Sequence, residues 1–300
     1  MMELKEGFVK GPWGNIATLS CGNPKGEKVL LVHGRLDSAA TYIPLLRLLP
    51  EKYHYVAFDM PGNGKSDPFP KGTILSRFIG VVVIDLVVKR LGWKEFIYFG
   101  HSLGAEQGLF YSAIYPKHIK KAIFLDPGPS LNWCRDVSYP VFFKETYENF
   151  YDNCHKYDYE KEYTMEEAIK AVRNNRALNE DQAKLILSRN LIEVGPETYK
   201  LSWDRRYKNL ATFNAPPEYY YELFTLHAPP SLLVCSMDLK PLFYTKRSIT
   251  AKLVTTWEEK WKNVKTIWVE GTHDLHFTSA NKFIHEVLSF LENPVVKSKI

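Results

Sequence analysis

The sequence predicts an α/β protein in which helices flank a mostly parallel sheet. Over the first 130 residues, short apolar runs alternate with amphipathic ones, which is typical of strand–helix units on a parallel sheet. The same alternation resumes after about residue 228. Residues 131–227 hold few strand-like runs and many Tyr, Glu and Lys residues. We therefore expect residues 1–130 and 228–300 to form one core, interrupted by a helical insertion.

The expected core strands are short runs rich in β-branched and aromatic residues, bounded by turn residues. They are Lys28–Val32, Tyr55–Phe58, Glu95–Phe99, Ala122–Leu125, Ser231–Cys235 and Thr266–Val269. Core helices are expected at Ile74–Leu91, Ala105–Tyr115 and Ala280–Leu291. In the insertion, Thr164 with Glu167 and Asn179 with Gln182 have the spacing of capping boxes, which predicts that helices begin there.

Composition excludes several classes of protein. The 300 residues are 45% hydrophobic and 24% charged, which is enough to bury a full core. The net charge of +5 comes from scattered residues of both signs, whereas a nucleic-acid-binding protein would cluster its positive charge. The four cysteines have no metal-ligand spacing, so we expect reduced thiols and no metal or organic cofactor. They are Cys21, Cys134, Cys154 and Cys235.

The chain has no expected membrane span or secretory signal. Its longest apolar run, Ile79–Val88, contains Asp85 and is too short to cross a bilayer. The first fifteen residues lack the apolar stretch of a signal peptide. We therefore expect an intracellular protein without stable membrane insertion. The last residues, Ser298, Lys299 and Ile300, are close to the Ser-Lys-Leu peroxisomal address, which favours a peroxisomal or cytoplasmic location and an import receptor as partner.

The strongest chemical motif is Gly100-His-Ser-Leu-Gly104, which lies between an expected strand and an expected helix. In that context Gly-x-Ser-x-Gly predicts a nucleophile elbow, a sharp turn that exposes Ser102 at the edge of the sheet. A serine needs a base that a carboxylate orients, and these partners follow it along the chain as acid and then histidine.

The base is expected in the loop after the last strand. His273 lies there, and His276, three residues later, is the alternative. The acid is expected after the preceding strand, which favours Asp238. Asp126, directly after the strand Ala122–Leu125, is the alternative acid.

The oxyanion that forms on attack needs N–H donors. One is expected from the backbone of Leu103, the residue after the nucleophile, and the other from the backbone of Arg35, in the loop after the first buried strand.

These motifs together resemble the α/β-hydrolase superfamily. Three further stretches resemble its serine hydrolase-like (kraken-type) group: Gly11-Pro-Trp-Gly-Asn-Ile16, His33-Gly-Arg-Leu-Asp-Ser-Ala39 and Gly92-Trp-Lys-Glu-Phe96. The group tends to carry Trp after His-Gly, where this chain has Arg35. A guanidinium there can bind an anionic substrate or point to solvent.

The resemblance implies a serine hydrolase, often associated with peroxisomes, whose insertion forms a helical lid (cap). We expect cleavage of an apolar carboxylic ester or thioester through Ser102, His273 and Asp238, by way of an acyl-enzyme. Two alternatives stay open: the same triad can catalyse a lyase, cyclase or isomerase reaction, or the scaffold can be a non-catalytic receptor for a small ligand. In the lid, Trp133 and Phe143 are candidates for an apolar substrate pocket. The alternative is that an aromatic helix face packs the lid onto the core; its residues, spaced three to four apart, are Phe142, Phe143, Tyr147, Phe150 and Tyr151.

The C-terminal motif yields the first testable prediction. Removing Ser298, Lys299 and Ile300 from a protein tagged at its N-terminus is expected to shift it from peroxisomes to the cytosol, because the import receptor reads the terminal tripeptide. Fluorescence microscopy beside the full-length tagged protein measures the shift, and an unchanged distribution contradicts the prediction.

Overall fold

The computed structural model describes residues 2–134, 136–158, 161–245, 248–260 and 263–293. The terminal tripeptide Ser298, Lys299 and Ile300 lies outside these residues. Within them, no helix is both long enough and apolar enough to cross a membrane.

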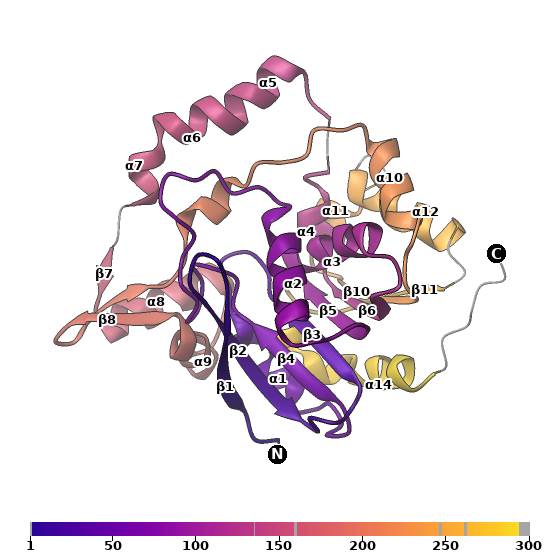
Figure 1. Cartoon of the computed structure of the whole chain (residues 1–300), viewed down its shortest axis with the longest axis horizontal. Coiled ribbons are helices and arrows are strands. Elements are labelled where there is room, and N and C mark those ends of the chain that lie inside the picture. The colour runs from indigo at the N-terminus through magenta and orange to yellow at the C-terminus, as the bar shows by residue number, and fades with distance from the viewer. Residues whose placement is uncertain (1, 135, 159–160, 246–247, 261–262, 294–300) are drawn as a thin grey trace.

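A sheet of eight strands forms the core (Figure 1), in the order β1-β2-β4-β3-β5-β6-β10-β11. β2 is antiparallel to β1 and to β4, whereas every neighbouring pair from β4 to β11 is parallel. The predicted fold class is therefore confirmed. The strands are β1 Lys5–Lys10, β2 Asn15–Gly22, β3 Lys28–Val32, β4 His54–Phe58, β5 Phe96–His101, β6 Ile119–Leu125, β10 Ser231–Ser236 and β11 Val264–Val269.

Both faces of the sheet are covered by helices. In β3, Leu30 and Val32 belong to one buried cluster, whereas Val29 and Leu31 belong to the other, because side chains alternate along a strand. Residues of α2, α3 and α12 complete the first cluster, and residues of α1, α13 and α14 the second. These helices are α1 Ile43–Leu46, α2 Ile79–Arg90, α3 Leu103–Ile114, α12 Ile249–Lys260, α13 Leu275–Thr278 and α14 Ile284–Glu292.

Helix α2 begins later than its apolar pattern predicts, at Ile79 and not at Ile74. The preceding residues pair with a distant segment: the N–H of Ala211 donates to the carbonyl of Leu75, and the N–H of Arg77 donates to the carbonyl of Ala211. The backbone groups that a helix would use are thus already bonded.

The insertion is helical, but it also contains a small sheet that its sequence pattern does not predict. This antiparallel sheet has the order β7-β9-β8, and Figure 1 shows it to one side of the core, with α5–α7 standing off above. Both capping boxes are present, at Thr164 and Asn179. The elements are β7 Glu162–Tyr163, β8 Leu191–Gly195, β9 Thr198–Leu201, α5 Tyr139–Phe143, α6 Asn149–Asp152, α7 Cys154–Tyr157, α8 Met165–Arg176, α9 Glu180–Asn190 and α10 Pro217–Thr225.

Arg176, the last residue of α8, ties the insertion to the core. Its guanidinium donates to both carboxylate oxygens of Asp37, at 3.1 Å each, and to those of Asp274, at 2.6 and 2.9 Å. Only 16% of the Arg176 side chain is exposed. Burial raises the pKa of Asp274, but the adjacent Arg176 outweighs it, so the pKa is lowered. Both carboxylates therefore depend on one cation from the insertion.

The bonds of Arg176 to Asp37 and Asp274, which we call the clamp, predict a large effect of Arg176→Met on stability. Removing one partner of a buried ion pair leaves uncompensated charge and costs about 3–5 kcal/mol, so the free energy of unfolding is expected to fall by about that amount. Urea unfolding measures it. The control Lys170→Met changes an exposed residue of the same helix, and equal losses in the two variants would contradict the prediction.

Candidate active site

Ser102 occupies the sharp turn between β5 and α3, with φ 51° and ψ −112°. A non-glycine residue at positive φ is strained, which is a feature of functional sites. The two flanking glycines make the turn possible: a Cβ on Gly100 would lie 2.6 Å from the carbonyl oxygen of Gly104, and a Cβ on Gly104 would overlap the carbonyl of Val32. The predicted elbow geometry is therefore present.

His273 lies in the loop after β11 and is bonded to a buried carboxylate. Its Nδ1 lies 2.6 Å from Oδ2 of Asp126, which is fully buried directly after β6. The other oxygen of Asp126 accepts the backbone N–H of Ser236 at 3.1 Å. Such a carboxylate holds one tautomer of the imidazole, with the proton on Nδ1 and Nε2 free to accept.

The preference for Asp238 as the acid needs correction. Asp238 is exposed in the turn that follows β10, whereas His273 contacts Asp126, the alternative acid. Both carboxylates follow neighbouring parallel strands, so chain order alone does not separate them. The register of β10 decides which carboxylate contacts His273. Its last residue, Ser236, donates its N–H to Asp126 and its hydroxyl to the carbonyl of Gly271, in the loop that carries His273.

His276, the alternative base, is fully buried in α13. Burial lowers its pKa to about 3, so it stays neutral and is closed to solvent. His101, which precedes Ser102, is also buried, and its Nε2 donates to the backbone carbonyl of His273 at 3.0 Å. The rings of His101 and His273 lie 4.6 Å apart. His101 thus brings the nucleophile elbow and the histidine loop together.

The loop after β3 lies against the elbow. A Cβ on Gly34 would lie 3.3 Å from Cβ of Ser102, so the loop approaches the nucleophile closely at this glycine. No acceptor is found among the described residues for the N–H groups of Leu103 and Arg35, the two expected oxyanion donors. The guanidinium of Arg35 is partly exposed. Burial and the charge of Arg77 lower the pKa of Arg35.

Asp37, His101 and His276 lie close enough together to share a metal ion, with ligand atoms within 4.8 Å of one another. Both oxygens of Asp37, however, accept from Arg176, so its negative charge is already matched. We interpret these three residues as part of the contacts that hold the loop after β3 against the loop after β11, and assign no metal to them.

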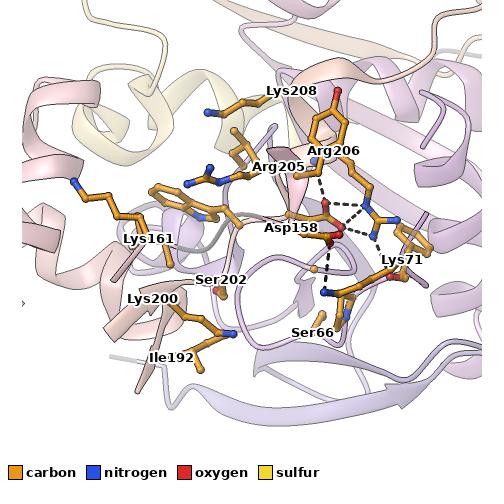
Figure 2. Close-up of a pocket in the computed structure, with 18 of the residues that line it drawn as sticks. Ser66, Lys71, Asp158, Lys161, Ile192, Lys200, Ser202, Arg205, Arg206 and Lys208 are labelled. Carbon is orange, nitrogen blue, oxygen red and sulfur yellow. Dashed lines mark hydrogen bonds and ion pairs between the residues drawn. The ribbon is translucent and has the colours of Figure 1, made fainter. Parts of the chain in front are cut away.

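A cavity of about 540 Å³ lies between the insertion and the core, and Figure 2 shows its charged lining. Leu36, the residue after Arg35, contributes to its wall. Trp133 and Phe143 are not among its described lining residues, and their side chains are 41% and 44% exposed. The prediction that they form the pocket is therefore wrong for this cavity. No residue of α5 is buried. Phe150 in α6, which belongs to the same predicted aromatic face, is 4% exposed and lines the cavity.

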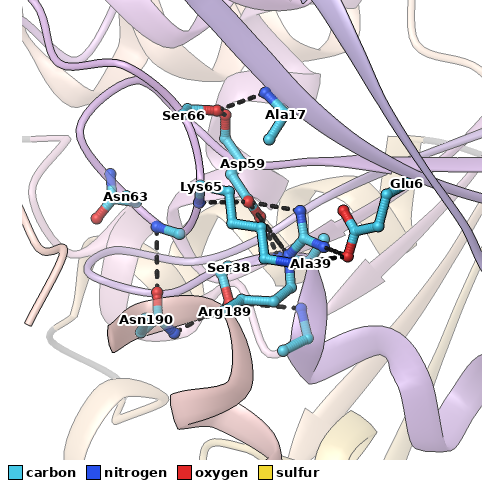
Figure 3. A network of polar contacts seen from close by, with 12 residues as sticks. Glu6, Ala17, Ser38, Ala39, Asp59, Asn63, Lys65, Ser66, Arg189 and Asn190 are labelled. Carbon is cyan, nitrogen blue, oxygen red and sulfur yellow. Dashed lines mark hydrogen bonds and ion pairs between the residues drawn. The ribbon is translucent and has the colours of Figure 1, made fainter. Parts of the chain in front are cut away.

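Arg189, a second arginine of the insertion, bonds a buried carboxylate in the turn after β4 (Figure 3). Asp59, fully buried in the turn after β4, accepts the backbone N–H groups of Ala39 and Lys65 at 2.7 and 2.9 Å and Arg189 at 2.7 Å. Arg189 also binds Glu6 at 2.6 Å. Periodicity could not find Arg176 or Arg189, because an arginine on an amphipathic helix is typical of a solvated face.

Comparisons with known proteins agree with this architecture. A sequence model of the alpha/beta hydrolase fold matches residues 28–157. A serine hydrolase-like protein of Danio rerio is 26% identical over 94% of this chain and 86% of its own length. Serine hydrolase-like protein 2 of Homo sapiens is 24% identical over 94% of this chain and 92% of its own.

Solved structures give the same fold. A hypothetical protein from Pseudomonas aeruginosa PAO1 superposes with a TM-score of 0.81 at 21% identity, covering 96% of this chain and all of that one. The thioesterase domain from the curacin biosynthetic pathway gives a TM-score of 0.77 at 20% identity, covering 95% and 99% of the two chains. The chain is thus an α/β-hydrolase-fold protein. Its resemblance to the serine hydrolase-like proteins, expected from the motifs, is confirmed.

The buried histidine yields a prediction on pH. The pKa of His276 falls from 6.5 to about 3 on folding, so the unfolded chain binds a proton that the folded chain excludes. Stability is then greatest above pH 6.5 and falls as the pH decreases toward 3. Between pH 7.5 and 5, the free energy of unfolding of His276→Phe is expected to fall by about 2 kcal/mol less than that of the wild type.

Urea unfolding at several pH values measures this difference. His285→Phe, at an exposed position of α14, is the control and should follow the wild-type pH dependence. A His276→Phe variant whose stability falls as steeply as that of the wild type would show that His276 is not held neutral.

Proposed function

We propose that the protein is a serine hydrolase that cleaves a carboxylic ester or thioester with an apolar acyl group. The contact between His273 and Asp126 carries this proposal, because it supplies an oriented base. His101, which directly precedes the strained Ser102, bonds the backbone carbonyl of His273 and so ties this base to the elbow. The names of the relatives, serine hydrolase-like proteins, support it. So do a thioesterase domain and a carboxylesterase of Bacillus subtilis among the proteins of the same fold.

In the proposed reaction, Ser102 Oγ attacks the substrate carbonyl while Nε2 of His273 takes its proton. The N–H groups of Leu103 and Arg35 stabilise the oxyanion. His273 then gives the proton to the leaving alcohol or thiol, which departs and leaves an acyl-serine. A water molecule, deprotonated by His273, attacks the acyl-serine and releases the acid, and the proton returns to Ser102. Asp126 holds the imidazole throughout.

Labelling with a fluorophosphonate probe tests the activated serine without knowledge of the substrate. We expect Ser102→Ala to abolish labelling. Asp126→Asn should slow it by about 10⁴-fold, because the imidazole loses its tautomer partner. Asp238→Asn is the matched control, since it makes the same chemical change at an exposed carboxylate, and it should label at the wild-type rate.

Two outcomes would contradict the proposal. A folded wild-type protein that the probe does not label would favour a non-catalytic receptor. Loss of labelling in Asp238→Asn but not in Asp126→Asn would assign the acid to the other carboxylate. With an ester that the enzyme accepts, ¹⁸O-water should place one labelled oxygen in the released acid, and an unlabelled product would indicate another reaction of the triad.

A further inference from the structure

Arg35 lies in the loop after β3, directly beside the nucleophile elbow. The loop approaches Ser102 at Gly34, where a Cβ would lie 3.3 Å from Cβ of Ser102. The backbone N–H of Arg35 is the second proposed oxyanion donor, so its side chain begins next to the carbonyl that Ser102 would attack. The contacts of this guanidinium therefore bear on which substrates the site accepts.

The loop that carries Arg35 is held in a strained conformation. Leu36 has φ 54°, in the left-handed region that a residue with a bulky side chain adopts only at a cost. Contacts on both sides maintain this conformation: Nδ1 of His33 lies 2.7 Å from the carbonyl oxygen of Gly34, and Asp37 belongs to the clamp. Strain that the surroundings fix in this way is a feature of ligand-binding sites.

The buried carboxylates leave no partner for Arg35. Five carboxylates are buried among the described residues, and each contacts a basic side chain other than Arg35. The contacts are Asp37 and Asp274 with Arg176, Asp59 with Arg189, Glu106 with Arg77, and Asp126 with His273. In the described part of the chain, no hydrogen bond or ion pair of the Arg35 side chain is found.

Arg35 also lies close to another cation. The charge of Arg77 acts on it, and Arg77 bonds Glu106, in the first turn of the helix that follows Ser102. Glu106 balances the charge of Arg77. The charge that stays unbalanced within this group of three side chains is that of Arg35, beside the nucleophile.

An anion would satisfy Arg35 better than water does. The residue is exposed, so a substrate can reach it. A guanidinium presents a planar fork of N–H donors that pairs with a carboxylate through two parallel hydrogen bonds. Water accepts the same hydrogen bonds but leaves the repulsion by Arg77, whereas a negative charge offsets that repulsion as well.

We propose that Arg35 binds a carboxylate of the substrate and so determines specificity for an anionic ester or thioester. Since one residue supplies both the oxyanion donor and the guanidinium, the carboxylate lies within a few bonds of the carbonyl that is attacked. This inference rests on the proposed function, in which the acyl group is apolar. The carboxylate therefore belongs to the leaving group, which is a hydroxy acid or a mercapto acid. Hydrolysis releases this acid with a proton from His273, and water then releases the apolar acid from the acyl-serine.

Binding to the full chain carrying Ser102→Ala, measured by isothermal titration calorimetry, tests recognition without turnover. The ligands are octanoyloxyacetate and its amide, octanoyloxyacetamide, which are of similar size and differ in charge. We expect the acid to bind at least about 10-fold more tightly, because hydrogen bonds between charged groups are stronger than neutral ones. Adding Arg35→Gln should make the two affinities equal, and Arg35→Lys should retain part of the difference because it keeps the charge.

The control Arg90→Gln makes the same chemical change at an exposed arginine. Arg90 ends α2, which leads into the start of β5, so it lies at the opposite end of that strand from Ser102. This variant should keep the full preference for the acid. Equal affinities for acid and amide with Arg35 intact, a preference that persists in Arg35→Gln, or a preference lost in Arg90→Gln would each overturn the proposal.

The ratio of kcat/KM for the two esters tests the consequence for catalysis, because any loss of oxyanion stabilisation that affects both esters cancels in it. In the wild type the acid should be favoured at least about 10-fold, and Arg35→Gln should bring the ratio close to one. A wild-type ratio near one overturns the inference. If the acid binds more tightly but the fluorophosphonate probe does not label Ser102, the hydrolase proposal fails while recognition of the carboxylate stands. Labelling without any preference for the acid has the opposite meaning.

Discussion

The site depends on one buried cation, the guanidinium of Arg176. It bonds Asp37, two residues after the expected oxyanion donor Arg35, and Asp274, the neighbour of His273. Two loops that follow different strands are thus joined through a residue of the insertion. Each carboxylate is buried and would be uncompensated without its partner, so the contacts of α8 with the core stabilise this arrangement of the loops. The insertion is therefore part of the site's framework.

Uncharged side chains, those of His101 and Ser236, also hold the loop that carries His273. His101 stays neutral because burial, with the nearby imidazoles of His276 and His273, lowers its pKa well below the ordinary value. A neutral imidazole can donate a hydrogen bond to the carbonyl of His273 without adding a charge beside that residue. Ser236 plays a similar part at the end of β10, where its N–H donates to Asp126 and its hydroxyl donates to the carbonyl of Gly271. Neutral donors, His101 and Ser236, thus position the loop that carries His273, whereas Arg176 balances the charge of the buried carboxylates.

Local patterns predicted the turn at Ser102 and the position of His273 in a loop after the last strand, because an elbow and a strand end are each encoded within about ten residues of sequence. The choice of acid was not local. Asp126 and Asp238 both follow parallel strands, and only the bond from Ser236 shows which carboxylate turns toward His273. The two-residue strand β7 likewise has no pattern of its own, since its pairing with β9 is a tertiary contact. Sequence periodicity shows which residues share one face of a helix or strand, so it predicted the core well. It missed the bonds of Arg176 to Asp37 and Asp274, because these join segments far apart in the sequence.

The cations of the insertion fall into two groups. Arg176 and Arg189 each face buried carboxylates of the core, and their charge is balanced within the fold. Lys161 and Lys208 line a cavity whose described acids are already paired with other cations. Loss of a cation of the first group would leave a buried carboxylate uncompensated.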